Sequence, residues 1–292
     1  MIFSVIIPTY NRKKEIKECL QSLYDQDFPR KDYEIIVVDD GSLDGSYKEL
    51  LHQNICLLRL KKNEGPSKAR NFGALRASGK YLAFTDSDCV LPRDWLKLMY
   101  EAFNKYKDLS CVGGNIINID NSIFGNYETY LYKSYIKKNA SYISKERDEA
   151  PFALGNICYL KKDFVDVGGF LDRYPAHCSG EDSYLKEKFL KRQKKVLYIP
   201  VDVLHNHKYS LSGFTNQSLE RGGGMLLDSK RKGKFQRKSL IVLRLILTPL
   251  YICYSLVKFN RNLYLVFCDS MFYFFRNIGK LKYYNLVKEF KF

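Results

Sequence analysis

Residues 81–95, "YLAFTDSDCVLPRDW", run from an apolar segment directly into two aspartates, Asp86 and Asp88. The apolar segment has the length and composition of a buried β-strand. One aspartate after such a strand often only begins a turn or caps the next helix. A second carboxylate two residues later indicates instead a place where the sheet binds a ligand.

The chain before this stretch repeats the same arrangement. Apolar runs at 2–7, 33–38 and 55–60 are each followed by a segment with the composition or spacing of a helix. These runs are continuously apolar, which is typical of a mostly parallel sheet covered by helices on both faces. We therefore expect an α/β fold. Within it, Pro66 should begin a helix, and Gly79 should cap the end of that helix.

The rest of the chain continues the sheet and then changes character. Residues 110–119 are expected to form another strand, and 196–200 and 201–207 two more. After about residue 215 the pattern becomes helical and basic. We therefore divide the chain into a sheet domain at 1–214 and a basic, hydrophobic helical tail at 215–292.

Asp39 and Asp40 follow an apolar strand in the same way as Asp86 and Asp88. Ligands of an open parallel sheet bind beyond the carboxyl ends of its strands, and four carboxylates at one edge repel each other unless a cation compensates. In an extended segment, residues i and i+2 point the same way, so Asp86 and Asp88 could face one ion. Oxygen ligands favour Mg²⁺ or Mn²⁺ over zinc, and such ions are commonly shared with substrate phosphates. A simple turn at Asp88, and a helix cap at Ser42, remain the alternatives.

Several classes of protein are disfavoured by what the sequence lacks. It contains neither G-x-G-x-x-G after a strand nor G-x-x-x-x-G-K-[ST], so we expect no dehydrogenase and no P-loop enzyme. The eight cysteines are scattered without C-x-x-C spacing, as expected for reduced thiols in the cytosol. The N-terminal segment lacks the order of a signal peptide, so we expect the chain to begin inside the cell.

The formal net charge is +16, and the tail carries most of it. Residues 230–238, "KRKGKFQRK", contain six basic residues. The apolar segments 241–257 and 263–275 are short and contain charged residues, whereas a spanning helix needs about 20 mostly apolar residues. Their mix of aromatic, apolar and basic residues is typical of segments in a membrane interface. We expect attachment to an anionic membrane surface; packing on the sheet domain and true spanning are the alternatives.

A family resemblance rests on motifs that occur in order. They are "SVIIPTYNR", "IIVVDDGSLDGS", "NEGPSKARNFGALRASGKYLAFTDSD", "VGGF" and "GEDSYL". In these motifs the chain resembles a family 2 glycosyltransferase with the GT-A fold, from residue 1 to about residue 210. The resemblance implies a Rossmann-like, mostly parallel central sheet flanked by helices. It also implies an inverting enzyme that uses a nucleotide-diphosphate sugar, often UDP-linked.

The resemblance also implies roles for individual residues. The positions expected to contact the nucleotide sugar are Pro8, Thr9, Tyr10, Arg12, Asp39, Asp40, Arg70 and Asp86. Asp86 and Asp88 match the D-x-D motif that holds the metal and the donor. Asp182 matches the general base, with Glu181 beside it, although both also suit the first turn of a helix.

Two histidines, His205 and His207, would share one face of a strand. Either could be a third metal ligand or contact the diphosphate, and we assign His207 to the metal. The alternative for each is a hydrogen-bonded histidine near the surface.

These observations predict metal-dependent transfer of a sugar from a nucleotide-diphosphate sugar to a saccharide or lipid-linked acceptor, using Mg²⁺ or Mn²⁺. We expect a role in cell-envelope polysaccharide or glycolipid synthesis at the inner face of the cell membrane. A sugar-phosphate nucleotidyltransferase is less favoured, because its first strand is usually followed by a glycine-rich loop and "PTYNRKKE" has no glycine. Net charge permits a nucleic-acid-binding protein, but the acidic sheet edge would repel phosphates, so we expect no nucleic-acid partner.

Overall fold

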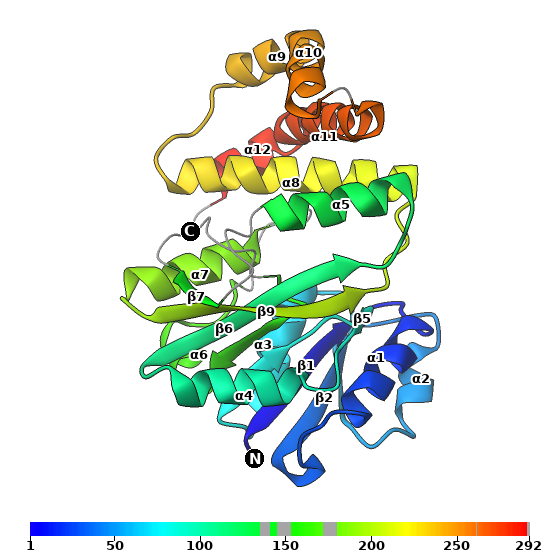
Figure 1. Ribbon diagram of the computed structural model, residues 1–292, viewed down its shortest axis with the longest axis vertical. Coiled ribbons are helices and arrows are strands. Elements are labelled where there is room, and N and C mark those ends of the chain that lie inside the picture. The colour runs from blue at the N-terminus through cyan, green and yellow to red at the C-terminus, as the bar shows by residue number, and fades with distance from the viewer. Residues whose placement is uncertain (135–140, 145–152, 172–179, 261, 291–292) are drawn as a thin grey trace. The chain divides into compact units, whose positions relative to one another are not determined.

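The computed structural model describes most of the chain (Figure 1). The described residues are 1–134, 141–144, 153–171, 180–260 and 262–290. They form two compact units. The first unit comprises the described residues of 1–119, 131–173 and 181–207, and the second is made mainly of 120–130 and 208–290.

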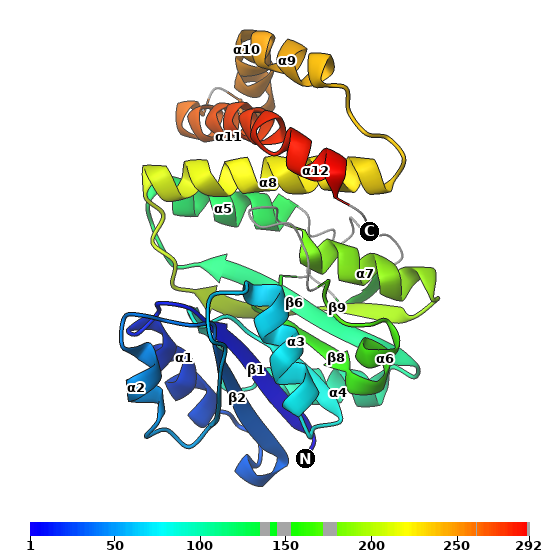
Figure 2. The ribbon, with the colours of Figure 1, turned by 180° about the vertical axis from the view of Figure 1, so that it is seen from behind.

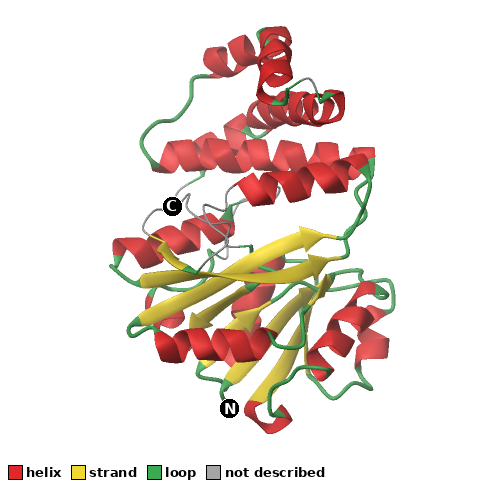
Figure 3. Cartoon of the chain, in the orientation of Figure 1, coloured by secondary structure: helices red, strands yellow, loops and turns green. Residues whose placement is uncertain are grey.

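The first unit is built on one sheet, in which nine strands are described (Figure 3). They are β1 (Phe3–Thr9), β2 (Tyr33–Asp39), β3 (Cys56–Arg59), β4 (Tyr81–Phe84), β5 (Cys89–Val90), β6 (Leu109–Asn118), β7 (Tyr142–Ser144), β8 (Ile157–Leu160) and β9 (Lys195–His205). Their order is β3-β2-β1-β4-β8-β6-β9-β5, with β7 also paired to β9. β1 to β4 are parallel neighbours, β8 is antiparallel to β4 and β6, and β6 is parallel to β9. The mostly parallel sheet expected from the sequence is confirmed.

Helices cover both faces of this sheet (Figures 1 and 2). They are α1 (Glu15–Tyr24), α2 (Ser46–Leu50), α3 (Pro66–Arg76), α4 (Trp95–Lys105), α6 (Lys161–Asp166) and α7 (Glu181–Lys191), with a 3₁₀ turn at Arg30–Asp32. The side chains of β1 explain why its sequence is continuously apolar. Val5 and Ile7 join a core with α1 and α4, and Ile6 joins a second core with α3 and α7. Both faces of the strand are buried, so neither can be polar.

The helix α3 begins at Pro66, as expected, but it ends at Arg76 and not at Gly79. Ala77 is already extended, with φ −63° and ψ 137°. Gly79 is needed for a different reason, because a Cβ there would lie 2.5 Å from the backbone nitrogen of Ser4. The predicted cap was wrong, since glycine here permits close approach to β1 and does not provide a left-handed conformation.

The two strands expected at 196–200 and 201–207 form one continuous strand, β9. The pairing of β6 with β9 shifts register between Gly113 and Asn115, which pair with Tyr198 and Asp202. Pro200 lies within this irregular stretch. A proline donates no ladder hydrogen bond and is tolerated at such bulges, so it interrupts the pairing without ending the strand.

The second unit is helical, which confirms the expected helical C-terminal region. Its helices are the first part of α5 (Ile123–Ser134), α8 (Leu211–Arg231), α9 (Lys238–Ile246), α10 (Thr248–Lys258), α11 (Leu263–Lys282) and α12 (Tyr284–Glu289). α8 and α11 cross closely because Gly222 and Gly279 have no side chains: a Cβ at either would collide with a backbone carbonyl of the other helix. Within the unit, buried Glu128 accepts two hydrogen bonds from Arg221, at 2.7 and 2.6 Å.

The lengths of these helices bear on the membrane question. Among the described residues, no single helix is long and apolar enough to cross a membrane. Of the described helices, only α9 and α10 taken together have the length and apolar composition of a spanning segment, and they are bent by 63° at their junction.

Candidate active site

The carboxyl ends of β1, β2 and β4 lie at one edge of the sheet because the three strands are parallel neighbours. The loops that follow β1 and β2 are tied together. The backbone N–H of Asn11 donates to Ser42 Oγ at 2.9 Å, and Asn11 Oδ1 accepts from the N–H of Leu43 at 2.9 Å. Asn11 has a φ of +53°, a conformation that asparagine tolerates better than most residues. Ser42 therefore fixes a loop and does not cap α2, which begins at Ser46.

Asp39 and Asp40 use their carboxylates to hold this edge in shape. Asp39 is fully buried; its Oδ2 lies 3.1 Å from Arg59 Nε, and its Oδ1 accepts from the N–H of Ser42 at 3.2 Å. Asp40 accepts from the N–H groups of Glu64 at 2.7 Å and Gly65 at 2.9 Å. Burial raises the pKa of Asp40, and these two hydrogen bonds act in the opposite direction. Both predicted nucleotide contacts thus have partners that define the loops before α2 and α3.

The end of β1 presents three further predicted nucleotide contacts. Pro8 and Thr9 are buried, and Thr9 Oγ1 has no hydrogen-bond partner among the described residues. Tyr10 follows them and is 42% exposed. Pro8 is tolerated in a central strand because the pairing of β1 with β4 has already ended, at Ile6 and Phe84.

The segment from Asp86 to Asp88 is not extended. The segment between them turns, because the N–H of Cys89 donates to the carbonyl oxygen of Asp86 at 3.0 Å. Our assumption of an extended segment was wrong here, and the two carboxylates find different partners. Asp86 Oδ1 accepts from Arg70 Nη2 at 2.6 Å. Asp88 points toward the end of β9.

Arg70 connects Asp86 to the start of α7. Its Nη1 lies 3.9 Å from Glu181 Oε1, and its side chain is only 5% exposed. The Nε and Nη1 atoms of Arg70 make no hydrogen bond to any described residue. A buried guanidinium with unused donors is suited to an anionic ligand. Asp182, the predicted base, lies next to Glu181 in the first turn of α7, and its Oδ1 accepts from the N–H of Ser183 at 2.6 Å.

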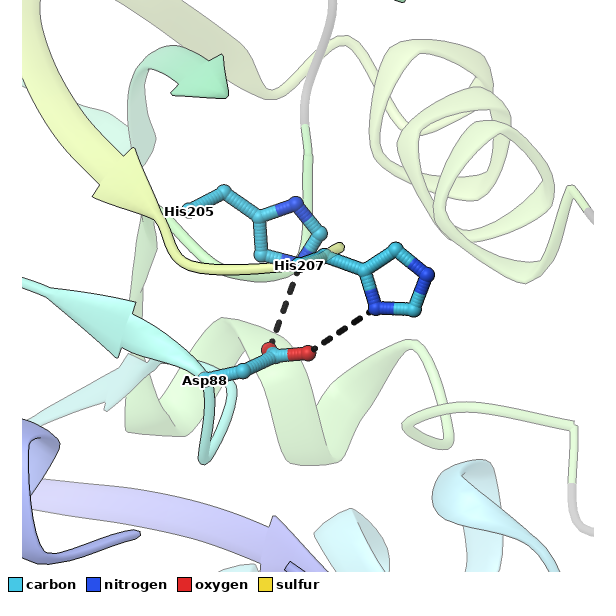
Figure 4. Close-up of side chains that lie close together, drawn as sticks. All are labelled: Asp88, His205 and His207. Carbon is cyan, nitrogen blue, oxygen red and sulfur yellow. Dashed lines mark ion pairs between the residues drawn. The ribbon is translucent and has the colours of Figure 1, made fainter. Parts of the chain in front are cut away.

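Asp88, His205 and His207 form a cluster (Figure 4). Asp88 Oδ1 lies 3.2 Å from His205 Nε2, and Asp88 Oδ2 lies 3.6 Å from His207 Nδ1. The backbone explains this proximity: β5 pairs Cys89 with His205, and the N–H of Asn206 donates to the carbonyl oxygen of Asp88 at 2.7 Å. The structure therefore brings together the predicted pair Asp88 and His207 and adds His205.

Charge in this cluster is shared between the carboxylate and the cationic groups around it. Burial works to raise the pKa of Asp88, but hydrogen bonds from His205 and His207 and the charges of His205 and Arg12 outweigh burial and hold the pKa well below its usual range. Burial works to lower the pKa of His205, but its hydrogen bond to Asp88 and the charge of that carboxylate raise the pKa overall. Arg12 Nη2 lies 3.6 Å from Asp88 Oδ2.

The cluster fits a divalent cation. One ligand atom from each of Asp88, His205 and His207 can be chosen so that all lie within 4.8 Å of one another. Two of the three donors are imidazole nitrogens, so the donor set is not made of oxygen ligands alone, as the sequence had led us to expect. The carboxylate of Asp88 suits Mn²⁺ or Mg²⁺, whereas imidazole nitrogens are more typical ligands of transition-metal ions such as Zn²⁺ or Fe²⁺.

Two features of the site escaped assignment from the sequence. His205 was weighed as a ligand but not chosen, although the spacing H-N-H contained the signal. Asn156 gave no signal at all: it is fully buried, donates to the carbonyls of Asn115 and Val201 at 2.6 and 2.9 Å, and accepts from Trp95 Nε1 at 2.9 Å. It ties β6 to β9 from a position just before β8.

Comparisons with known proteins find glycosyltransferases. GlyA, a glycosyltransferase of Streptococcus pneumoniae, is 31% identical over 210 residues, which cover 67% of this chain and 29% of GlyA. Poly(ribitol-phosphate) β-N-acetylglucosaminyltransferase TarS of Staphylococcus aureus is 42% identical over 104 residues, or 33% of this chain and 18% of TarS. AglE of Haloferax volcanii is 38% identical over 119 residues, or 39% and 38%. This chain thus spans less than two fifths of the length of these curated relatives.

Solved structures show the same fold. Mannosyltransferase PcManGT of Pyrobaculum calidifontis, solved with GDP-Man and Mn²⁺, matches with a TM-score of 0.64 at 16% identity, covering 99% of this chain and 88% of that one. TarS 1–349 of S. aureus, solved with UDP-GlcNAc, matches with a TM-score of 0.62 at 19% identity, covering 98% and 92%.

The family itself is established by sequence. The model described as Glycosyl transferase family 2 matches residues 4–168, more than half of the 292 residues. The matched range includes both aspartate pairs and Arg70. The chain therefore belongs to glycosyl transferase family 2.

Proposed function

We propose that this chain transfers a sugar from a nucleotide-diphosphate sugar to an acceptor hydroxyl, with inversion at the anomeric carbon and with the help of a divalent cation. One observation carries the proposal. The cation-fitting cluster of Asp88, His205 and His207 shares the carboxyl edge of the sheet with Asp86, which is paired to buried Arg70. A cation and a guanidinium together provide what a diphosphate requires.

The donor is held by the loops at this edge. Arg70 offers two donors, Nε and Nη1, that make no hydrogen bond to a described residue and suit diphosphate oxygens, and Arg12 adds a second guanidinium. Thr9 and exposed Tyr10 contact the nucleotide, and Pro8 sets their direction. Asp39 and Asp40 act through the loops that they fix. TarS shares 42% identity with this chain over 104 residues and is named as an N-acetylglucosaminyltransferase. It has been solved with UDP-GlcNAc, so we favour a UDP-linked donor.

The reaction needs one base and one stabilised leaving group. The carboxylate of Asp182 takes the proton of the acceptor hydroxyl as its oxygen attacks the anomeric carbon, and the bond from that carbon to the diphosphate oxygen breaks. Attack from the face opposite the leaving group inverts the configuration. The carboxylate of Glu181 lies 3.9 Å from Arg70 and so holds the start of α7, which carries Asp182, next to the donor-binding guanidinium. A bound divalent cation would neutralise charge that develops on the leaving diphosphate.

The acceptor and the location are proposed from the relatives. Two of them are named for transfer to poly(ribitol-phosphate), and another for minor teichoic acid biosynthesis. These names support a saccharide or lipid-linked acceptor in cell-envelope glycan synthesis. We place the reaction at the cytoplasmic face of the membrane, where nucleotide sugars are available.

The proposal is tested by thermal unfolding of the full chain with a panel of UDP- and GDP-sugars, with Mn²⁺ or with EDTA. A ligand that binds only the folded state raises the Tm by mass action. We expect one nucleotide sugar to raise the Tm with Mn²⁺ and to do so much less with EDTA. Asp88→Ala should remove the Mn²⁺-dependent part. The proposal fails if no nucleotide sugar shifts the Tm under either condition.

A further inference from the structure

The helices α9 and α10 of the second unit expose apolar side chains along their length. Each helix buries a single residue, Ile241 in α9 and Ser255 in α10. The exposed apolar residues, which we call the α9–α10 surface, are Leu240, Val242, Leu243, Ile246, Leu247, Leu250, Ile252, Tyr254 and Val257. Exposed apolar side chains gathered on two consecutive helices are typical of an interaction site.

In α10 the polar side chains face the protein and the apolar ones face outward, which is the reverse of the usual arrangement in a helix on a water-exposed surface. Tyr251 and Ser255 direct their hydroxyls inward and donate to Asp269 Oδ2 on α11, at 2.8 and 2.7 Å. Leu250 and Val257 face outward and are 65% and 83% exposed. Helices normally bury their apolar stripe and solvate their polar one. The opposite arrangement is favourable where the surroundings of the helix are themselves apolar.

Basic side chains border this surface. Lys234, Arg237 and Lys238 precede or begin α9, and no acidic residue in the described part of the chain forms an ion pair with them. By contrast, the neighbouring Arg231 is paired with Asp228 at 2.6 Å. Arg244 lies on α9 itself and is exposed among the apolar residues. Cations that form no ion pair with the described acidic residues and lie around an apolar surface match the anionic headgroups that surround the acyl region of a bilayer.

We propose that the α9–α10 surface docks on an anionic lipid bilayer, with its apolar side chains at the boundary between headgroups and acyl chains. Helices of 9 and 11 residues rise only about 14 and 17 Å at 1.5 Å per residue, and the 63° bend prevents them from adding to the ~30 Å of a hydrocarbon core. The pair therefore lies in one leaflet. Figures 1 and 2 show both helices on the side of α11 that faces away from α8, so α11 supports them. A second copy of the chain would bring the same basic border against itself, which disfavours it as the partner.

The test is flotation of the full chain with vesicles of phosphatidylcholine alone or with phosphatidylglycerol. We expect the wild type to float with the anionic vesicles and much less with the neutral ones. Leu250→Glu should lower the partition coefficient about tenfold, because an exposed leucine that would enter the bilayer is replaced by a charge. Lys234→Gln/Arg237→Gln/Lys238→Gln should lower it about a hundredfold on anionic vesicles and little on neutral ones, at ~1 kcal/mol per charge.

The matched control is Leu75→Glu, since Leu75 is 80% exposed on α3, far along the chain from the α9–α10 surface. It should float like the wild type. Binding that is unaffected by Leu250→Glu, or equal binding to neutral and anionic vesicles, overturns the proposal. Failure to float together with a dimer in light scattering that Leu250→Glu dissolves identifies a second copy as the occupant and also overturns it. Mn²⁺ binding by the variants separates this outcome from failure of the proposed function.

The insertion of α10 into the bilayer is measured with a thiol-reactive bimane label, whose fluorescence reports the polarity around it. Cys253 is exposed on α10, and Cys56 is exposed on β3. Cys178, which lies outside the described residues, is replaced by serine in both proteins. In one protein Cys56→Ser leaves Cys253 for the label, and in the other Cys253→Ser leaves Cys56. Anionic vesicles should shift the emission of the label at Cys253 to the blue and leave the label at Cys56 unchanged. Equal emission at both positions contradicts docking through α10.

Discussion

Arg12 holds its guanidinium 3.6 Å from the carboxylate of Asp88. The same Nη2 atom lies 3.5 Å from His207 Nδ1, so a cationic side chain already stands beside two of the three candidate metal ligands. A divalent ion at these ligands would be repelled by Arg12 until a donor diphosphate arrives to share it. Under the proposed function Arg12 would therefore link the metal to the donor, and its removal should separate the two.

Arg12→Ala should bind Mn²⁺ several-fold more tightly than the wild type in the absence of donor, because one positive charge within a few ångströms is removed. The same variant should need more donor for half-maximal rate. Electron paramagnetic resonance of free Mn²⁺ measures the first effect. Lys13→Ala is the control, since Lys13 is in the same loop but pairs with Glu49 at 2.8 Å. Weaker Mn²⁺ binding by Arg12→Ala would identify Arg12 as support for the ligands and not as a competitor.

Mn²⁺ affinity should fall as the pH is lowered through the raised pKa of His205. Metal binding needs an unprotonated imidazole, and the hydrogen bond to Asp88 keeps the proton on His205 to higher pH than usual. The apparent affinity should change by up to tenfold per pH unit for each bound proton that must leave. Titrations between pH 6 and 8.5 measure this slope, and His205→Gln should flatten it. Exposed His52→Gln should leave the slope unchanged.

In the metal-free protein, the contribution of His205 to the free energy of unfolding should fall as the pH rises, whereas Mn²⁺ affinity should rise with pH. The folded-state pKa of His205 is raised, so its contribution is complete below its unfolded pKa and is lost as the pH rises through the folded value. The lowered pKa of Asp88 adds stability that is lost only in acid. Chemical unfolding without metal should therefore show a loss around and above neutral pH, and His205→Gln should remove it. A loss of the same size in the variant would assign the effect to other groups.

Asp182→Asn should lower the transfer rate by about 10² to 10⁴, the range typical of a lost general base, and leave donor affinity within about twofold. The amide has nearly the same shape but does not accept the acceptor's proton. Single-turnover transfer and donor titration measure the two effects. Glu187→Gln, on the same helix and paired with Lys191, should retain both. Normal turnover by Asp182→Asn would remove Asp182 from the role of base.

Gly79→Ala should destabilise the first unit by about 1–3 kcal/mol or more, because a Cβ has no room against β1. The fluorescence of Trp95, which is the single tryptophan of the chain and fully buried in the first unit, follows this unfolding. Gly213→Ala is the comparison: its nearest new neighbour is Ser210 Oγ at 3.3 Å, and alanine suits a helix. An unchanged Trp95 transition in Gly79→Ala would show that β1 and the loop can separate at little cost.

The sequence was most informative where one physical cause dominates. Continuous apolar runs predict strands buried on both faces, and Ile6 and Ile7 face opposite cores as that argument requires. Parallel order then places Asp39 and Asp86 at one edge. The direction of a side chain in a turn has no such cause: the hydrogen bond from Cys89 to Asp86 separates Asp86 from Asp88, and nothing in D-x-D specifies it.

The pairing of distant strands could not be predicted either, because no single feature of the sequence specifies it. His205 joins Asp88 because β5 pairs with β9 across more than a hundred residues, a register that composition does not encode. Gly79 was assigned to a helix end because glycine serves several purposes, and only the neighbouring backbone of Ser4 distinguishes them. Asn156 looked like an ordinary polar residue, and its role depends entirely on three distant partners.

The pairing of β5 with β9 extends over two residue pairs, Cys89 with His205 and Val90 with Leu204. So small a ladder frays easily, and each opening would carry His205 away from Asp88 while the rest of the sheet stays folded. An ion bound to both Asp88 and His205 would hold β5 and β9 together. The amide hydrogen of Asn206, which bonds to the carbonyl of Asp88, would then exchange with solvent more slowly as Mn²⁺ is added. Local order of this strand pair and occupancy by a cation would then be coupled in one equilibrium.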